Sequence, residues 1–356
     1  MNPKTKIWLQ AVGKCALFLV LLVTMVSLLN AVFVGKEYNQ ALSFVEKQPD
    51  GEYDVILAGP SHMQFAVEPA QLFGEQGIAA ANVCTTAQSI PSTYYMVKEM
   101  IDRHDPELVI VDLFCLFHPE KIFAPARVHQ MLDHFPLSEN KIAAVQDLIE
   151  ENREEFYIPL MLYHGRWKEL TRNDYMMYFE TNETYQLLSG IQPFTEPFVP
   201  VPVEETEEIP EIPLAYLEKI VQLCKDTDTQ LLLTVVPYRA DVDNNETSAL
   251  YQQRIFNKAQ ELAAQWGVDY LNGLHFLEEM SFDFATDMVE YSHVNPFGGE
   301  KISAFYGQYI RDHYDVPDRS QDPDYADWYA DYDEYLQKLQ EWDETVQLWK
   351  QLAEQK

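Results

Sequence analysis

Five short apolar runs, separated by longer amphipathic stretches, set the pattern of the chain between residues 54 and 313. The runs are Val55 to Ala58, Ile78 to Cys84, Leu108 to Phe114, Leu231 to Val236 and Val268 to Leu271. Runs of this length, apolar on both faces, are typical of parallel strands that helices cover on two sides. The pattern predicts an α/β fold, a three-layer α/β/α sandwich around a five-stranded parallel, flavodoxin-like sheet.

The alternation of strands and helices is interrupted between residues 117 and 229. This stretch contains helix-like pieces, an aromatic and basic cluster at residues 163–167, and a proline- and glutamate-rich strip from Pro193 to Pro213. So many prolines exclude a regular helix or a central strand. We therefore expect a domain at 54–316 that carries a helical insertion at 117–229, placed as a cap over the site and followed by an extended connector.

The N-terminal region has the composition of a membrane anchor. Twenty-one uncharged, mostly apolar residues lie between Lys14 and Lys36, enough to span about 30 Å of hydrocarbon as a helix. Three lysines, Lys4, Lys6 and Lys14, come before the run, which predicts a cytoplasmic N-terminus and an extracellular C-terminal domain. A cleaved signal peptide is the alternative, but the run is long and no Ala-x-Ala site follows it. Residues 1–36 are thus the expected anchor, and residues 37–53 a polar stalk.

Charge and composition exclude several function classes. The formal net charge of −32 argues against nucleic-acid binding, which needs a basic surface. The histidines show no zinc-type spacing, and there is no glycine-rich phosphate loop, so neither a metal nor a cofactor is expected. Three cysteines follow the anchor, in apolar surroundings, and are expected to be buried free thiols.

The C-terminal residues 317–356 are predicted to form an acidic amphipathic helix. Its apolar face would carry residues spaced by three or four positions: Tyr325, Trp328, Tyr332, Tyr335, Leu339, Trp342, Val346 and Trp349. Two interpretations remain open: the face packs back on the domain, or it binds a glycan or a partner helix.

Two short motifs carry the candidate chemistry. Ser61 stands in the sequence GPSH directly after the first strand, where open α/β sheets place their ligands. His293 stands in EYSHVNPFGG directly before the last helix, with Glu290 three residues earlier. A serine, a histidine to take its proton and an acid to orient the histidine form the pattern of nucleophilic acyl transfer.

The two motifs together resemble the first and last blocks of the SGNH (GDSL-like) hydrolase superfamily. The resemblance looks closest to its membrane-anchored, extracytoplasmic members in Gram-positive envelopes, similar to the teichoic acid D-alanyl transfer protein and to polysaccharide O-acetyltransferase-type domains. It implies Ser61 as nucleophile, His293 as base and Glu290 as acid. The chain departs from the superfamily pattern at Pro60, at the identity of the acid, and in lacking a Gly-x-Asn-Asp block.

Other residues are weaker candidates for the site. Besides the backbone N–H of Ser61, Gln88 or Asn82 would donate to the oxyanion. His62 is expected either to contact substrate or to hydrogen-bond backbone. The cluster of Tyr163, His164, Arg166 and Trp167 in the insertion suits an anionic glycan or acyl donor, although a packed Trp with a surface Arg explains it as well.

Two hypotheses about function follow. The first is a membrane-anchored, extracytoplasmic serine esterase or O-acyltransferase that acts on a cell-envelope glycan or lipid-linked polymer, with a multi-pass membrane O-acyltransferase as partner if it transfers acyl groups. The second is a catalytically silent scaffold or binding subunit of an envelope polysaccharide-modifying complex.

Overall fold

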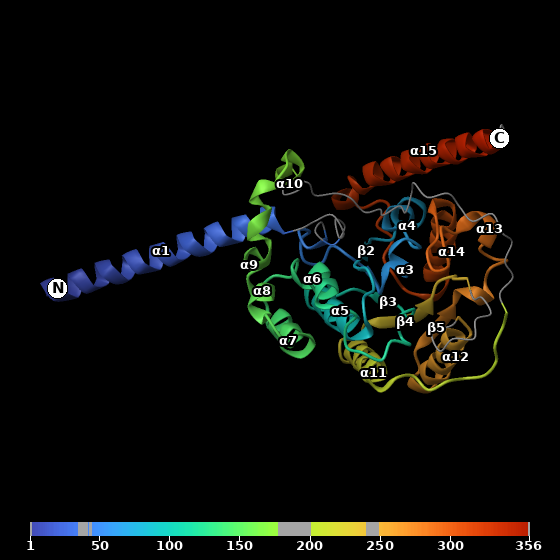
Figure 1. The fold of residues 1–356 in the computed structure, drawn as a ribbon, viewed down its shortest axis with the longest axis horizontal. Helices are drawn as coiled ribbons and strands as arrows, with labels where there is room; N and C mark the ends of the chain where they lie inside the picture. The colour runs from blue at the N-terminus through green and yellow to red at the C-terminus, as the bar shows by residue number, and fades with distance from the viewer. Residues whose placement is uncertain (1, 35–41, 43–44, 177–200, 240–248, 355–356) are drawn as a thin grey trace.

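The computed structural model describes residues 2–34, 42, 45–176, 201–239 and 249–354 (Figure 1). Its centre is a parallel sheet of five strands in the order β2-β1-β3-β4-β5. The strands are β1 Val55–Ala58, β2 Ala80–Asn82, β3 Leu108–Asp112, β4 Gln230–Val235 and β5 Asp269–Asn272. The predicted fold is confirmed, and the order is the flavodoxin-like one in which the chain changes direction between β1 and β3.

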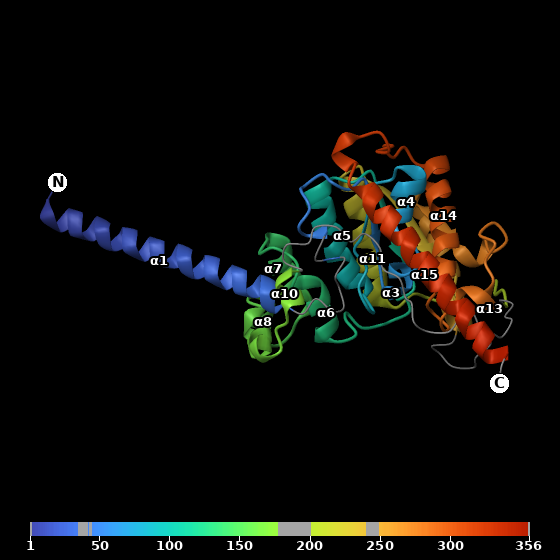
Figure 2. The same ribbon diagram turned by 90° about the horizontal axis from the view of Figure 1, so that it is seen from above.

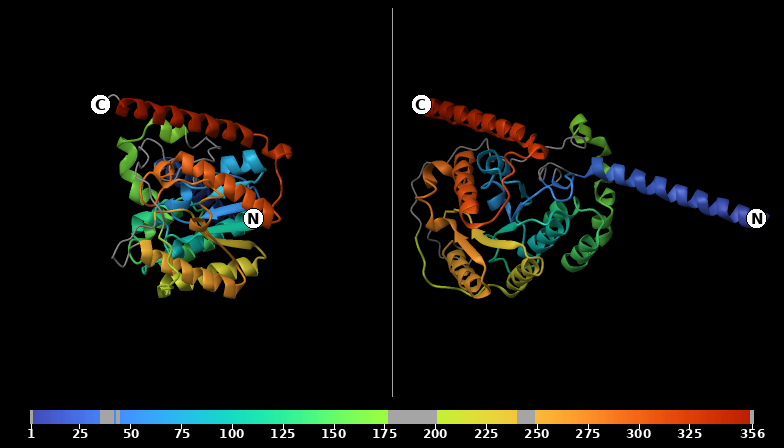
Figure 3. Two further views of the ribbon diagram at one scale, coloured as in Figure 1. Left: turned by 90° about the vertical axis from the view of Figure 1, so that its right-hand side faces the viewer. Right: turned by 180° about the vertical axis from the view of Figure 1, so that it is seen from behind.

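Alternate residues of each strand enter two different cores. Ile56, Val109 and Leu233 belong to the core beneath α5 (Ile90–His104), α11 (Glu211–Asp226) and α12 (Ala249–Trp266). Leu57, Ile110 and Leu232 belong to the core beneath α4 (Pro69–Gln76) and α14 (Pro296–His313). Figure 3 shows the sheet between these two helical layers. Burial on both faces explains why the strands read as apolar runs without alternation.

The insertion begins beside the serine turn, because its first residue, Phe117, contacts Phe114, which stacks on His62; the expected cap over the site stays a prediction. The short helices α6 to α10 lie on the side of the molecule where the chain enters, while α13 (Phe284–Asp287) and α14 lie on the other side (Figures 1 and 2). Their bounds are α6 Pro125–Leu132, α7 Glu139–Leu148, α8 Arg153–Tyr157, α9 Leu160–Tyr163, the 3-10 helix η1 His164–Lys168, and α10 Arg172–Met176.

The connector after the insertion is extended where it is described, as predicted. Its backbone runs along α12, where Gln253 Nε2 donates to Val201 O at 2.8 Å and Asn257 Nδ2 donates to Val203 O at 2.7 Å. Its first residues, 193–200, lie outside the described part. The helix that follows it, α11, is part of the sandwich rather than of the insertion.

The helix α1 (Pro3–Phe33) projects away from the domain (Figure 2). It is long and apolar enough to span a membrane, with a mean hydropathy of 2.5 over its best 18-residue window, and none of that window is buried in the protein. The structure thus supports an N-terminal anchor helix by length and composition.

The segment expected as a polar stalk is packed against α5 in its described part. Val45 and Tyr53 are buried, and Arg103 of α5 donates to the carboxylate of Glu46 at 2.7 Å. Residues 45–53 therefore belong to the domain; residues 35–41 and 43–44 lie outside the described part.

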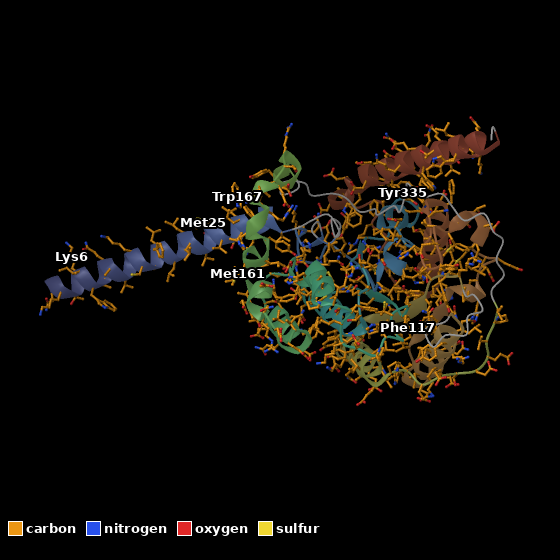
Figure 4. The ribbon with its side chains drawn as sticks, in the orientation of Figure 1. Lys6, Met25, Phe117, Met161, Trp167 and Tyr335 are labelled. Carbon is orange, nitrogen blue, oxygen red and sulfur yellow. The ribbon has the colours of Figure 1, made fainter. Side chains whose placement is uncertain are left out.

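The C-terminal helix α15 (Trp328–Glu354) follows a short 3-10 turn, η3 (Pro323–Tyr325), and packs on α4 and α14. Tyr335, labelled in Figure 4, is fully buried, and its hydroxyl donates to Gln71 Oε1 at 2.8 Å. Gly74 is required here because a Cβ would lie 2.2 Å from the ring of Tyr332. The aromatic face of the tail is therefore an internal contact, the first of the two interpretations.

Candidate active site

Ser61 is placed at the carboxyl end of β1 by a turn that only glycine permits. Gly59 has φ +148°, and a Cβ there would lie 2.9 Å from Cβ of Asp112, the last residue of β3. The chain thus passes closely over the end of β3 before α3 (Ser61–Gln64) begins. This is the point where the strand order reverses, the usual location of a ligand site in such sheets.

The loop that carries His293 is held by backbone pairing and by an asparagine cap. Val289 N donates to His293 O at 2.9 Å, and Met288 forms an antiparallel bridge with Val294. Asn295 accepts at its side-chain oxygen from Phe297 N and Gly298 N, the first free donors of α14. The residues EYSHVN thus form a fixed turn at the start of α14.

The three predicted catalytic side chains come together. Ser61 Oγ lies 2.9 Å from His293 Nε2, although 232 positions separate the two residues in sequence. The other ring nitrogen of His293, Nδ1, is hydrogen-bonded to Glu290 Oε1. Since an ionised carboxylate can only accept, Nδ1 carries the proton and Nε2 is left to accept from the serine hydroxyl. This is the connectivity of a Ser-His-acid triad.

Glu290 is kept ionised by its neighbours. Partial burial would raise the pKa of this carboxyl, but hydrogen bonds from His293 and from Ser292 outweigh that effect and lower the pKa to about 2. Ser292 Oγ donates to Glu290 Oε1 at 2.7 Å. The acid of the triad is therefore negatively charged throughout the physiological pH range, as a residue that stabilises an imidazolium must be.

His62 has neither of the two roles that the sequence suggested, contact with substrate or a hydrogen bond to backbone. Its ring is 2 % exposed, so it does not face a substrate, and its Nδ1 is bonded to the Asp112 carboxylate at 2.8 Å rather than to backbone. The ring also stacks on Phe114, with 4.1 Å between the ring centroids. His62 and Asp112 therefore tie α3 to the end of β3 directly behind Ser61.

Of the two expected side-chain oxyanion donors, only Gln88 has a free N–H. Asn82 donates its two amide hydrogens to Gln64 O and Val67 O, both at 3.1 Å, and so holds α3 in place. Gln88 accepts from Thr85 N at 3.2 Å, and its buried Nε2 has no partner among the described residues. Thr85 in turn pairs with Pro60, which brings this loop beside the serine turn.

The aromatic and basic cluster of the insertion is not brought to Ser61. Tyr163 donates to Asp133 at 2.6 Å, and Arg166 donates to the carbonyl of Phe33, the last residue of α1, at 2.6 Å. His164 bonds to Met161 O within its own turn, and Trp167 is 64 % exposed. These residues lie at the base of the anchor helix, so their expected role in substrate binding is not supported.

The buried thiols are outside the candidate chemistry. Burial raises the pKa values of Cys84, Cys115 and Cys224, which keeps them protonated.

Within the described residues, no three His, Cys, Asp or Glu side chains gather in a way that would hold a metal ion. A cavity of about 710 Å³ between the 119–125 loop and α7–α8 lies apart from the triad.

Two site residues were not singled out from the sequence. Ser292 lies inside the EYSH motif, where a hydroxyl between acid and histidine is the signal that could have identified it. Asp112 ends an otherwise apolar strand, and a carboxylate at the carboxyl end of a buried strand is a comparable signal.

No protein-family model matches the chain, and no curated protein matches it significantly. The chemistry of the site is therefore inferred from its geometry.

Proposed function

We propose that the protein is a serine-dependent esterase or O-acyltransferase that works through an acyl-serine intermediate. The observation that supports this most is the 2.9 Å contact between Ser61 Oγ and His293 Nε2, with the opposite ring nitrogen held by an ionised Glu290. Apo hydrogen bonds between nucleophile and base are often longer than this.

The reaction follows from these contacts. Ser61 Oγ attacks the ester carbonyl carbon while His293 Nε2 takes the hydroxyl proton, and Glu290 stabilises the imidazolium that forms. The tetrahedral intermediate collapses, the imidazolium gives its proton to the leaving alkoxide, and the acyl group remains on Ser61. Water or a sugar hydroxyl then attacks the acyl carbon, passing its proton to His293, and Ser61 is released as the free hydroxyl.

The oxyanion would be bound by two donors. The backbone N–H of Ser61 is in the first turn of α3, where it has no acceptor within the helix. The amide of Gln88 is the second donor, because its Nε2 is buried and lacks a partner among the described residues. Removing one such donor typically lowers the reaction rate about 10²- to 10³-fold.

The cellular setting follows from α1. With Lys4, Lys6 and Lys14 at its start, the positive-inside tendency places the N-terminus in the cytoplasm and the domain outside. The substrate class that fits is then an ester on an envelope glycan or lipid-linked polymer. If the acceptor is a sugar hydroxyl rather than water, a multi-pass membrane protein would supply the acyl group.

A fluorophosphonate probe tests the proposal on the full chain in detergent. The serine oxygen displaces fluoride from phosphorus, so labelling reports an activated nucleophile. We expect labelling of the wild type and of Ser292→Ala, and none of Ser61→Ala. Ser292 is the matched control because its Oγ lies 3.1 Å from His293 Nδ1, on the other side of the ring. A wild type that is folded but not labelled would contradict the proposed enzymatic function and would favour the hypothesis of a catalytically silent scaffold subunit.

A further inference from the structure

The last turn of α1 lies at the outer edge of the membrane if α1 is the anchor assumed in the proposed function. The uncharged part of α1, from Cys15 to Phe33, measures about 28 Å as a helix, close to the thickness of a hydrocarbon core. The helix ends at Phe33. Whatever is fixed to residues 30–33 is therefore fixed at the level of the lipid headgroups.

The segment α8 to α10 (residues 153–176) is attached to this turn. Leu160 N donates to the side-chain oxygen of Asn30 at 2.8 Å, and Arg166 Nη1 donates to Phe33 O at 2.6 Å. A cation at the C-terminal carbonyls of a helix is electrostatically favourable. Arg166 is itself held by Asp174 at 2.8 Å. These contacts fix the height of the segment relative to α1.

The segment runs across the end of α1 (Figure 1), and several of its apolar side chains are exposed. Neither α9 nor η1 contains a buried residue. Figure 4 shows Met161 and Trp167 beside the end of α1. The exposed fractions of the large apolar side chains are 43 % for Ile158, 48 % for Met161, 41 % for Leu162, 64 % for Trp167 and 49 % for Tyr175. Trp and Tyr at this depth are typical of the membrane interface.

The charge of the segment is also unlike that of the rest of the chain. Residues 153–176 contain four basic and four acidic side chains, namely Arg153, Arg166, Lys168 and Arg172 against Glu154, Glu155, Glu169 and Asp174. Their net charge is zero in a chain of net charge −32. The domain as a whole would be repelled by anionic headgroups, but this surface would not be.

We propose that residues 153–176 lie in the outer interface of the membrane that holds α1, as a second point of attachment. The exposed apolar side chains between Ile158 and Tyr175 enter the boundary between headgroups and acyl chains, as interfacial helices do. Because α13 and α14, which flank the His293 loop, lie on the other side of the domain, this attachment would keep that side away from the bilayer.

Spin labels on the full chain in phosphatidylcholine–phosphatidylglycerol nanodiscs test the proposal. The background is Cys15→Ser, since Cys15 is exposed while the other three cysteines are buried. The test and control positions are Leu162→Cys and Leu336→Cys, because these two helical leucines are equally exposed, 41 % and 42 %, and Leu336 is on the distant α15. Leu21→Cys, within α1, reports whether the anchor is in the bilayer.

Relaxation by oxygen and by a water-soluble nickel chelate is measured at each label. We expect position 162 to resemble position 21, with more oxygen than nickel contact, and position 336 to show the reverse. Equal nickel contact at 162 and 336 would overturn the proposal, and so would shielding of 162 from both reagents, which indicates a protein contact. Nickel contact at position 21 would instead refute the anchor on which the proposal rests.

Discussion

Replacing Glu290 by Gln removes the charge of the triad acid and keeps its size. The contacts of this carboxylate lower its pKa from 4.5 to about 2, which corresponds to a gross stabilisation of roughly 3 kcal/mol. The side chain is 43 % exposed, so solvent screening reduces the usable part to about 1.5 to 2 kcal/mol. We therefore expect Glu290→Gln to lower the rate of the acylation step about 10- to 30-fold.

This loss is smaller than the roughly 10⁴-fold loss known for a fully buried triad acid, because Glu290 is half-exposed. The second-order rate of fluorophosphonate labelling measures it without knowledge of the natural substrate. Glu279→Gln, an exposed carboxylate on the preceding loop, is the matched control and should label at the wild-type rate. A Glu290→Gln rate within twofold of the wild type, or one as low as that of His293→Ala, would refute the reasoning.

Three further predictions concern the surroundings of the triad and the core. Gln88→Glu keeps the acceptor for Thr85 N but removes the Nε2 donor. We expect this variant to lower kcat for a chromogenic acetyl ester at least 10²-fold, with KM little changed. An unchanged kcat would exclude Gln88 from the oxyanion site. His62→Ala removes the buried hydrogen-bond partner of Asp112 Oδ2 and should lower the free energy of unfolding by about 1 to 3 kcal/mol in chemical denaturation. Adding Asp112→Asn should recover part of this loss, and no recovery would contradict the argument from the lost partner. Burial lowers the pKa of His104 to about 4, so the stability that its neutral form contributes is complete above pH 6.5 and is lost as the pH falls toward 4. His104→Phe, which keeps the ring contact with Tyr53, should therefore flatten the pH dependence of the free energy of unfolding in that window by up to about 1.4 kcal/mol per pH unit. An unchanged slope would show that another group causes the pH dependence.

The fold was predictable because each strand is buried on both faces. The run LVIVD of β3 contacts two helical layers, so its sequence shows the parallel sheet directly. The triad was predictable for a related reason: parallel strands end at one edge, so a serine after β1 and a histidine before α14 meet there. The tail helix was recognisable from its aromatic spacing, but only its contacts with α4 and α14 decided between an internal and an external face.

What the sequence could not predict depends on contacts between distant segments. The cluster from Tyr163 to Trp167 has the residue types of a carbohydrate site, and nothing in its local pattern shows that Arg166 binds the end of α1. The side chain of His62 is next to the nucleophile in sequence, yet its direction is set by Asp112, fifty positions away. Asn82 matches an oxyanion donor by position, but two backbone carbonyls of the 64–67 turn take both of its hydrogens.

The acyl-serine intermediate is tested most directly by acid quench and peptide mass spectrometry. The full chain in detergent is mixed with an activated acetyl ester, quenched within the first turnover and digested. The structure predicts one acetyl group on the peptide that contains Ser61, and none on the same peptide of His293→Ala, because Ser61 Oγ is activated by that ring. Ester turnover that persists in Ser61→Ala, or an acetyl group on any other residue during turnover, would contradict the central claim.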